Sequence, residues 1–468
     1  MTSKKIDIAL QNGAVPQASI SDSVSQSVDN SAIKPKQTAP MLIASLLMVA
    51  YLFSFLDRQI LILMIEPIQR DLQLSDTMFS LLHGTAFALF YAIMGLFMGR
   101  LVDSYSRTNI ITFSIILWSA TTALCGVAKN FTQLFIARMF VGVGEAGLSP
   151  ATYSLVSDLF TPAKRAKAFA VYSMGIYFGT GIAFIVGGKL TAWLETIPPV
   201  DVPFFGLLYS WQITFFLIGL PGILLAIIIK LVIREPSRGV LDSSKNVNKP
   251  KASSSFADFR RHYLKNWQAY GGHNLGYALH MMYSYSLLAW LPAFYLRHHN
   301  WTISEIGMSI GPLFIICGSL GCITGSAFSE YLVKRGISDA QLRISAIGFV
   351  CLMIAGITAV SLENAQLSLI AVGIAIFFIG FPSGLSAASL QTITPANFRG
   401  QAGAVFLLIC NVLGLGIGPI MVALITEQFF GDKMMIGSSL LVTSLILMPL
   451  ATILLWRARN RFNVSAAA

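Results

Sequence analysis

The sequence predicts an all-α membrane protein with twelve transmembrane helices, arranged as two six-helix bundles that are related by pseudo-two-fold symmetry. Hydrophobic residues make up 55% of the 468 residues and charged residues only 11%, a balance that soluble globular domains do not have. Apolar runs of about 20 residues recur along the chain, and a helix of that length crosses roughly 30 Å of hydrocarbon. Short sequence matches also relate the first half of the chain to the second.

The apolar runs divide the chain into tails, bundles and a linker. Residues 1–40 are polar and are expected to form a disordered cytoplasmic tail. The two bundles are predicted at residues 41–233 and 268–457, with a linker at 234–267 between them and a short tail at 458–468. The predicted spans are 41–65, 76–102, 108–128, 133–157, 165–191, 209–233, 268–296, 304–331, 341–361, 366–390, 400–425 and 434–457.

Basic residues orient the predicted bundles. The loops opposite the termini carry only Arg70, Lys129, Arg297 and Lys433, each near the end of a span. The positive-inside rule therefore places both termini in the cytoplasm of a multi-pass protein of the cell (inner) membrane. The net charge of +11 reflects this topology, and no nucleic-acid partner is expected. The basic residues on the terminal side include Lys4, Lys5, Lys34, Lys36, Arg100, Arg107, Lys164, Arg165, Lys167, Lys334, Arg335, Arg343, Arg399, Arg457, Arg459 and Arg461.

The linker ends in an amphipathic segment, "FADFRRHYLKNW". Four aromatic residues share one helical face, and the basic residues lie off that face. The pattern predicts a short helix at the cytoplasmic membrane interface. The aromatic residues are Phe256, Phe259, Tyr263 and Trp267.

An internal repeat supports the division into two bundles. The segment 159–172 matches 392–406, since both contain Thr-Pro-Ala followed by arginine, Ala-Val and an aromatic residue. The segment 95–103 parallels 321–329, with two glycines four residues apart in each. Matches in the same order and in equivalent spans predict a parallel repeat, a layout in which transporters bind substrate between the halves.

The segment "GRLVDSYSRTN", which begins at Gly99, resembles the loop signature of the major facilitator superfamily. Gly99, Asp103 and Arg107 fit that signature, whereas Ser104 and Ser106 depart from it. The resemblance implies a gate. An anion at Asp103 would interact with the positive N-terminal end of the eleventh span and hold the cytoplasmic face shut. The alternative is a loop aspartate that pairs with Arg107.

The segment "RMFVGVGEAGLSP", which begins at Arg138, and the adjacent Asp57 and Arg58 resemble the Spinster-like branch of that superfamily. Superfamily resemblance extends over residues 41–457. Members of this branch are linked to export of amphiphilic lipids such as lysophospholipids and sphingosine-1-phosphate, and bacterial relatives are proton-linked. The resemblance therefore implies a proton-coupled secondary active transporter of a lipid-like or organic substrate, working by alternating access and driven by a proton gradient.

Charged residues inside the predicted spans are candidates for proton coupling. Each costs at least ~2.5 kcal/mol at the centre of a bilayer, so intramembrane charges indicate function. At 1.5 Å rise per residue, Asp57 and Arg138 lie at similar depth, roughly 10–12 Å from the outer edge. Glu145 shares the helix face of Arg138, two turns deeper. We expect Asp57 to face Arg138, with Glu145 further along the same cavity wall. Arg58 is rotated about 100° from Asp57 around the helix axis, so the two cannot address one partner. The alternative is a static ion pair that only fixes helix packing.

Polar residues inside the spans predict a substrate cavity. The seventh span is unusually rich in polar and aromatic residues, although packing and the aromatic belt at the membrane interface explain those near its ends. We expect the cavity to be lined by His83, Tyr172, His280, Tyr283 and Asn411.

Other functional classes find little support in the sequence. It has no GxxxxGK[ST] loop for ATP and no hydrolase triad outside the spans, so neither an enzyme nor a cofactor is expected. The five cysteines lie in apolar spans, and we expect neither disulfides nor a metal site. The alternatives are a proton-coupled symporter of small organic anions, since Arg58 and Arg138 suit a carboxylate, and an uncoupled membrane sensor or scramblase. We expect a monomer.

Overall fold

Helices form most of the structure because a chain that crosses hydrocarbon must satisfy its backbone hydrogen bonds within each segment. The computed structural model describes residues 39–203, 205–236, 256–395 and 398–467. Most of the predicted N-terminal tail and residues 237–255 of the predicted linker lie outside the described residues. The described residues whose side chains are not described are 103, 162–164, 166–167, 256 and 460–467.

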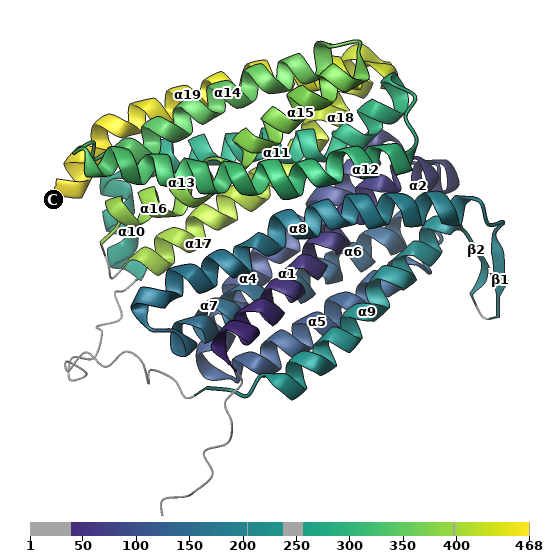
Figure 1. Ribbon diagram of the computed structural model, residues 1–468, viewed down its shortest axis with the longest axis horizontal. Coiled ribbons are helices and arrows are strands. Elements are labelled where there is room, and N and C mark those ends of the chain that lie inside the picture. Colours follow the sequence, from purple (N-terminus) through teal and green to yellow (C-terminus); the bar gives the residue numbers. More distant parts are fainter. Residues whose placement is uncertain (1–38, 204, 237–255, 396–397, 468) are drawn as a thin grey trace, which may run out of the picture. The chain divides into compact units, whose positions relative to one another are not determined.

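The first half of the chain contains nine α-helices, a π-helical turn and a two-stranded hairpin (Figure 1). The strands pair antiparallel, with Val200 opposite Leu208. The elements are α1 (Pro40–Leu63), α2 (Ile65–Leu72), α3 (Asp76–Ser80), η1 (Leu81–Thr85), α4 (Ala86–Ser104), α5 (Arg107–Cys125), α6 (Phe131–Glu145), α7 (Leu148–Leu159), α8 (Pro162–Glu195), β1 (Val200–Val202), β2 (Gly206–Leu208) and α9 (Ser210–Val232).

The second half begins with the predicted amphipathic helix and ends with a helix that continues ten residues past the predicted end of the last span. The elements are α10 (Phe256–Lys265), α11 (Trp267–His298), α12 (Ile303–Leu313), η2 (Phe314–Gly318), α13 (Ser319–Lys334), α14 (Ala340–Ser361), α15 (Ala365–Gly380), α16 (Ser383–Ile393), α17 (Arg399–Cys410), η3 (Asn411–Ile417), α18 (Gly418–Leu424), η4 (Ile425–Phe430), η5 (Lys433–Met435) and α19 (Ile436–Ala467).

Side-chain caps fix where several helices begin. The Ser106 hydroxyl accepts the Asn109 N–H at the start of α5, and the Asn130 side chain accepts the Gln133 N–H at the start of α6. At α12, Thr302 and Glu305 each accept the other's backbone N–H. These caps satisfy backbone donors that have no partner inside the helix.

Eleven helical segments of the described chain are long and apolar enough to cross a membrane. The predicted seventh span, α11, is a helix of 32 residues but is not one of the eleven. Its polar and aromatic residues lower its mean hydropathy. Most of them are buried against other helices and do not face lipid. With α11 included, each half contributes six long helical segments, as the sequence predicts.

Equivalent helices pack in both halves. Helix α5 packs against α9 and α6 in the first half, as α14 packs against α19 and α15 in the second. The repeated Thr-Pro-Ala segments begin at matching helix ends: Thr161 directly precedes α8, and Thr394 directly follows α16. There Arg165 donates to the carbonyls of Ser157 and Phe160, and Arg399 donates to the carbonyl of Thr394. The two-bundle architecture is thus confirmed.

The two halves touch unevenly along their length. We call the end that carries α10 and the C-terminus the tail end, and the end that carries β1 and β2 the hairpin end (Figure 1). Toward the hairpin end, α8 packs closely on α12: a Cβ on Gly188 would lie 2.8 Å from the Ile303 carbonyl, and one on Gly307 would overlap the Phe184 carbonyl. Small residues permit such close helix packing.

At the tail end, α4 and α17 are not in close contact at their glycines. A Cβ added to any of the four glycines would find no heavy atom within 4 Å. The halves therefore pack closely at α8 and α12 toward the hairpin end, whereas these glycine positions of α4 and α17 face open space. The four positions are Gly95, Gly99, Gly400 and Gly403.

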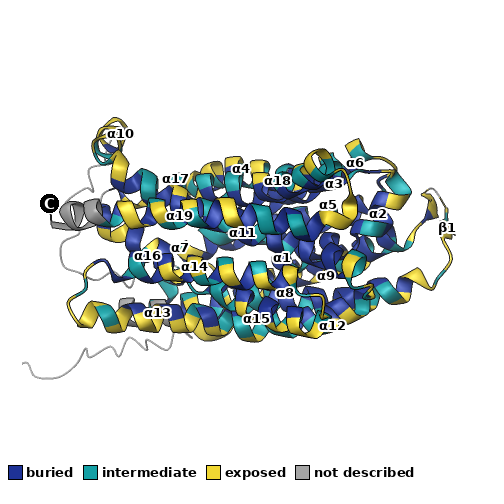
Figure 2. Ribbon diagram, turned by 90° about the horizontal axis from the view of Figure 1, so that it is seen from above, coloured by how far each residue is buried: buried dark blue, intermediate teal, exposed yellow. Residues whose placement is uncertain are grey.

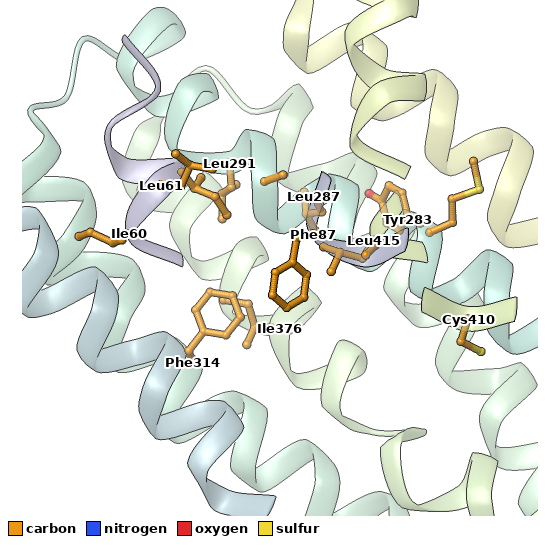
Figure 3. Close-up of a cluster of buried hydrophobic side chains, with 14 of the residues drawn as sticks. Ile60, Leu61, Phe87, Tyr283, Leu287, Leu291, Phe314, Ile376, Cys410 and Leu415 are labelled. Atoms are coloured by element: carbon orange, nitrogen blue, oxygen red, sulfur yellow. The ribbon is translucent and has the colours of Figure 1, made fainter. Parts of the chain in front are cut away.

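One apolar core runs through both halves. It includes Ile60 and Phe87 from the first half and Leu287, Phe314 and Leu415 from the second (Figure 3). Many apolar side chains are nevertheless exposed on the outward helix faces, where Figure 2 shows exposed positions along α12 and α13. Exposed apolar faces around a buried core fit a protein whose solvent is lipid.

A clasp of charged residues joins three elements at the tail end of the first half. The buried Arg107 side chain donates to the Asp158 carboxylate on α7 and, over 2.6 Å, to Glu235, which follows α9. Glu235 also accepts the backbone N–H of Thr108 and the hydroxyl of Ser106, each at 2.9 Å. The carboxylate therefore caps the N-terminus of α5.

The close packing of α8 on α12 predicts opposite effects for the same substitution at two glycines. Gly307→Ala inserts a methyl group against the Phe184 carbonyl and should cost about 1–3 kcal/mol of stability. Gly95→Ala has open space around it and should be neutral, or stabilising by up to about 1 kcal/mol. Thermal unfolding in detergent measures both. Equal melting temperatures for the two variants would contradict the close contact between the halves.

Glu235 predicts a pH-dependent contribution to stability. Burial alone would raise the pKa of this carboxyl, but hydrogen bonds from the Thr108 backbone, Arg107 and Ser106 lower it to about 2 from the ordinary 4.5. A carboxyl with a lowered pKa stabilises the folded protein fully above its unfolded pKa, and this contribution is lost as the pH falls toward the folded value. Glu235→Gln should therefore lower the melting temperature at pH 7 and differ progressively less from wild type below pH ~4.5. A pH-independent difference would contradict this.

Candidate functional site

A buried ion pair joins α1 to α6 inside the first half. Arg58 donates to the same oxygen of Glu145 from Nε at 2.7 Å and from Nη2 at 2.5 Å. Ser54, one turn before Arg58 on the same face of α1, donates to that oxygen at 2.5 Å. All three side chains are buried. Glu145 ends α6 just before a break in the helix, so this interaction fixes α1 against the break.

Aromatic rings enclose the Arg58 guanidinium. Its central carbon lies 4.8 Å from the ring centre of Phe55, 4.4 Å from that of Phe87 and 5.0 Å from that of Tyr91. Tyr285, on α11 of the second half, is also close enough to Arg58 for an electrostatic interaction. A cation held by aromatic faces is stabilised by the ring quadrupoles. The enclosure brings together residues from α1, α4 and α11.

The neighbouring acid, Asp57, points to a different helix. Its Oδ2 accepts a hydrogen bond from Thr122 on α5, and its Oδ1 has no hydrogen-bond partner among the described residues. Arg138 and Arg58 are near enough to attract the carboxylate electrostatically. Since successive helical residues are about 100° apart, Asp57 and Arg58 address different partners, as the sequence predicts.

The predicted ion pair between Asp57 and Arg138 is not formed. Within the described part of the chain, no ion pair joins them, and the pair that forms is between Arg58 and Glu145. The Arg138 side chain is fully buried, and none of its three guanidinium nitrogens has a hydrogen-bond partner in the described chain. Counting residues places Asp57 and Arg138 at a similar depth in the membrane, but it does not give the direction in which each side chain points around its helix. Among the described residues, Arg138 is therefore a buried cation with no hydrogen-bond or ion-pair partner.

Glycines allow α6 to approach its neighbours and position these charges. A Cβ on Gly142 would lie 2.5 Å from the Phe87 carbonyl, and one on Gly144 would lie 2.7 Å from the Trp118 backbone nitrogen. The helix therefore lies against α4 and α5 with no side chain between. The glycine pattern of this segment serves helix packing.

Two of the predicted cavity residues lie on facing π-helical turns. His83 is buried in η1, where it is close enough to Arg138 and Arg58 for electrostatic interactions. Asn411 begins η3 in the second half and donates to the Leu407 carbonyl at 2.9 Å. The turns η1 and η3 are in contact. π-Helical turns such as η1 and η3 are frequent at functional sites.

The other three predicted cavity residues pack within their own halves. Tyr172 stacks on Tyr51 of α1, with ring centres 4.4 Å apart, and shares a 2.9 Å hydrogen bond with Ser149. His280 stacks on a phenylalanine of α14, Phe349, at 4.5 Å. Tyr283 lies against α14 as well, at Gly356.

That His280 and Tyr283 line a substrate cavity therefore stays a prediction, and in this structure both make a different contact. Their side chains face α14, which packs inside the second half. Polarity in a span indicated buried side chains but not the face on which they lie.

The predicted gate residues have different outcomes. The side chain of Asp103 lies outside the described part of the chain. Gly99 has open space beside it, and Arg107 is held by Asp158 and Glu235 in the clasp described above. Arg107 therefore joins elements of the first half in this structure and does not contact the second.

The described residues add no metal ligands to this site. No group of three His, Cys, Asp or Glu residues in the described chain could hold a metal ion. The described groove, of about 270 Å³, lies between α14 and α15 and contains none of the predicted site residues. It is lined by Cys351, Ile354, Ala355, Thr358, Ala371, Ile374 and Phe378.

Comparison with known proteins places this geometry in a family. Residues 47–419 match the family model of the Major Facilitator Superfamily. An MFS-type efflux pump of Mycolicibacterium smegmatis is 25% identical over 88% of this chain and 90% of its own length. Protein spinster of Drosophila melanogaster is 28% identical over 61% of this chain, which covers 45% of that protein. A probable galactarate/D-glucarate transporter of Bacillus subtilis, GudP, is 25% identical over 86% of this chain and 90% of its own length.

A solved structure shows the same architecture. It is described as a bacterial homologue of the human lysosomal transporter Spinster, in an inward-facing and unoccupied conformation. The match has a TM-score of 0.74 and 25% identity and covers 93% of this chain and 98% of that chain. The proteins of this family are transporters and not enzymes, in agreement with the sequence prediction. The chain is a multi-pass membrane protein that belongs to the major facilitator superfamily, as a Spinster-like transporter.

Proposed function

We propose that this transporter is a proton-coupled secondary carrier that moves an amphiphilic, lipid-like substrate by alternating access. The observation that carries the proposal is the incomplete pairing of the buried charges. Arg58 and Glu145 form an ion pair, whereas Asp57 and Arg138 are both buried and have no ion-pair partner among the described residues. A buried charge without a partner is costly, and a carboxyl in that position relieves the cost by taking up a proton.

Protonation of Asp57 would change the forces on α1. The ionised carboxylate attracts Arg138 across the gap between α1 and α6, and the neutral acid does not. Because α1 packs on α8 and also contacts α11, a change in its position reaches both halves. The proton thus biases the equilibrium between two arrangements of the bundles. In this proposal the Arg58–Glu145 pair keeps α1 in register while Asp57 titrates.

The surroundings of the charges support an amphiphilic substrate. Arg58 and Arg138 offer positive charge to an anionic head group, and the rings around Arg58 offer apolar surface beside it. An arginine binds phosphate and carboxylate groups through its planar fork of donors. We place the substrate head group beside these residues, between η1 and η3, where His83 and Asn411 lie.

We further propose that the tail end faces the cytoplasm of a cell membrane and is open in this structure. Exposed basic residues at that end support this orientation, since Arg100, Arg260, Arg261 and Lys334 are all exposed there. Closure of the tail end would bring Gly99 and Asp103 of α4 toward the N-terminus of α17, whose glycines lie in open space here. We propose that the transporter acts as a monomer.

A second candidate is a proton-coupled symporter of small organic anions. The similarity to a probable galactarate/D-glucarate transporter favours it, as does a fully buried arginine without a partner, which suits a carboxylate. The two candidates share the proton site and differ in the apolar part of the substrate.

The proton site predicts the effect of one substitution. In liposomes that contain a pH-sensitive dye, a lysophospholipid should elicit proton flux through the wild type. Asp57→Asn should reduce this flux at least tenfold, because the site can no longer take up a proton. Asp201→Asn, an exposed carboxylate of the hairpin, is the matched control and should behave as wild type.

The same assay separates the competing candidates. Flux with a lysophospholipid and none with a six-carbon sugar acid supports the lipid-like substrate, and the reverse result supports the organic-anion symporter. Full flux in Asp57→Asn would overturn the assignment of the proton site. Substrate movement with no proton flux in any variant would overturn proton coupling itself.

A further inference from the structure

An arginine at the hairpin end of α11 bridges the two halves. Arg297 donates from Nη1 and Nη2 to the two oxygens of Asp76, at 2.8 and 2.9 Å, and from Nε to Glu66 at 2.9 Å. A third contact, to the Gln69 side chain, is 3.3 Å long. Arg297 belongs to the second half and its three partners to α2 and α3 of the first. The bridge therefore connects the two bundles directly.

The carboxylate at the centre of this bridge is fully buried. Asp76 is 0% exposed, and it also accepts a 2.7 Å hydrogen bond from Gln69. The Arg297 side chain is 8% exposed, whereas that of Glu66 is 45% exposed. A buried, two-pronged arginine–carboxylate pair is strongly disrupted by loss of one partner, and an exposed pair contributes little. The Arg297–Asp76 pair is therefore the dominant contact.

In a second bridge beside the first, the second half supplies the carboxylate and the first half the donors. Glu427, in η4 of the second half, accepts the backbone N–H of Asp76 at 2.6 Å and the hydroxyl of Thr77 at 2.5 Å. Further along the same helix pair, Ser80 donates to the Pro419 carbonyl and Thr85 to the Gly416 carbonyl. The start of the α3–α4 segment is thus fastened to the second half on two sides.

These described bonds from the first half lie between Asp76 and Thr85. Nearer the tail end, the glycines of α4 and α17 face open space. Nearer the tail end, Tyr177 of the first half shares a 3.0 Å hydrogen bond with Ser383 of the second half and also bonds to Cys322. Among the described residues, the ion pairs that join the halves are those of Arg297, at the hairpin end.

We propose that Arg297, with Asp76 and Glu427, forms a latch that holds the hairpin end closed in this state. The proposal rests on alternating access, as proposed above, and adds the residues that control it. Opening of the hairpin end must separate Arg297 from Asp76 and Glu427 from the N-terminus of α3, because these partners belong to different halves. Loss of either bridge then shifts the equilibrium toward the state that is open at the hairpin end.

Distances between spin labels test the latch without substrate or a proton gradient. Labels at Lys129→Cys and Lys433→Cys report on the hairpin end, and labels at Arg100→Cys and Lys334→Cys on the tail end; all four positions are exposed. The native cysteines are replaced in a background checked for wild-type melting. Arg297→Gln should shift the hairpin-end distances to longer values and the tail-end distances to shorter ones.

Matched variants keep the test falsifiable. Arg261→Gln removes an exposed arginine and should leave both distances unchanged. Glu66→Gln removes the exposed partner and should have a smaller effect than Asp76→Asn. If Arg297→Gln does not fold, Glu427→Gln tests the second bridge in the same way. Wild-type distances in both Arg297→Gln and Glu427→Gln would overturn the latch, even if proton-coupled transport is found; shifted distances without proton flux would support the latch and overturn only proton coupling.

Discussion

The ion pair between Arg58 and Glu145 is the interaction on which the arrangement of the first half depends. It fixes α1 against the break between α6 and α7, and everything else at the site is placed relative to it. Two charges in hydrocarbon are tolerated only when their geometry is good and their remaining bonding groups are satisfied. Ser54 donates to the carboxylate and aromatic rings surround Arg58, and the glycines of α6 give the space for this packing. Asp57, on the adjacent position, is thereby turned toward α5.

The two halves share their packing but differ in where their buried charged residues lie. At the tail end, each half has a comparable clasp: Arg107 with Asp158 in the first, and Asp339 with Arg343 and Arg459 in the second. In the described membrane-spanning core, the charged cluster of Arg58, Arg138, Glu145 and Asp57 belongs to the first half alone. The second half contributes buried tyrosines and histidines instead. A repeat that has diverged in this way keeps its packing, while this cluster of buried charges lies in one copy.

Composition and periodicity were enough to predict the architecture, because a helix in lipid has few alternatives and its length follows from the thickness of the membrane. They also identified the charged residues, since an intramembrane charge is conspicuous in any apolar run. Composition and periodicity could not predict that Arg58, and not Arg138, would pair with a carboxylate. Depth follows from counting residues, but the direction around a helix axis depends on neighbours such as Thr122 and Phe87. The same limit explains why the sequence did not show that His280 would stack on Phe349.

The glycines of α4 and α17 have a consequence for how sequence variation in this protein should be interpreted. In this structure a Cβ added at any of the four positions would meet no heavy atom within 4 Å, so a methyl group there has room. If the two surfaces meet when the tail end closes, as we propose, the same methyl group would stand between them. Tolerance of the substitution in a stability assay would then be no measure of its effect on transport.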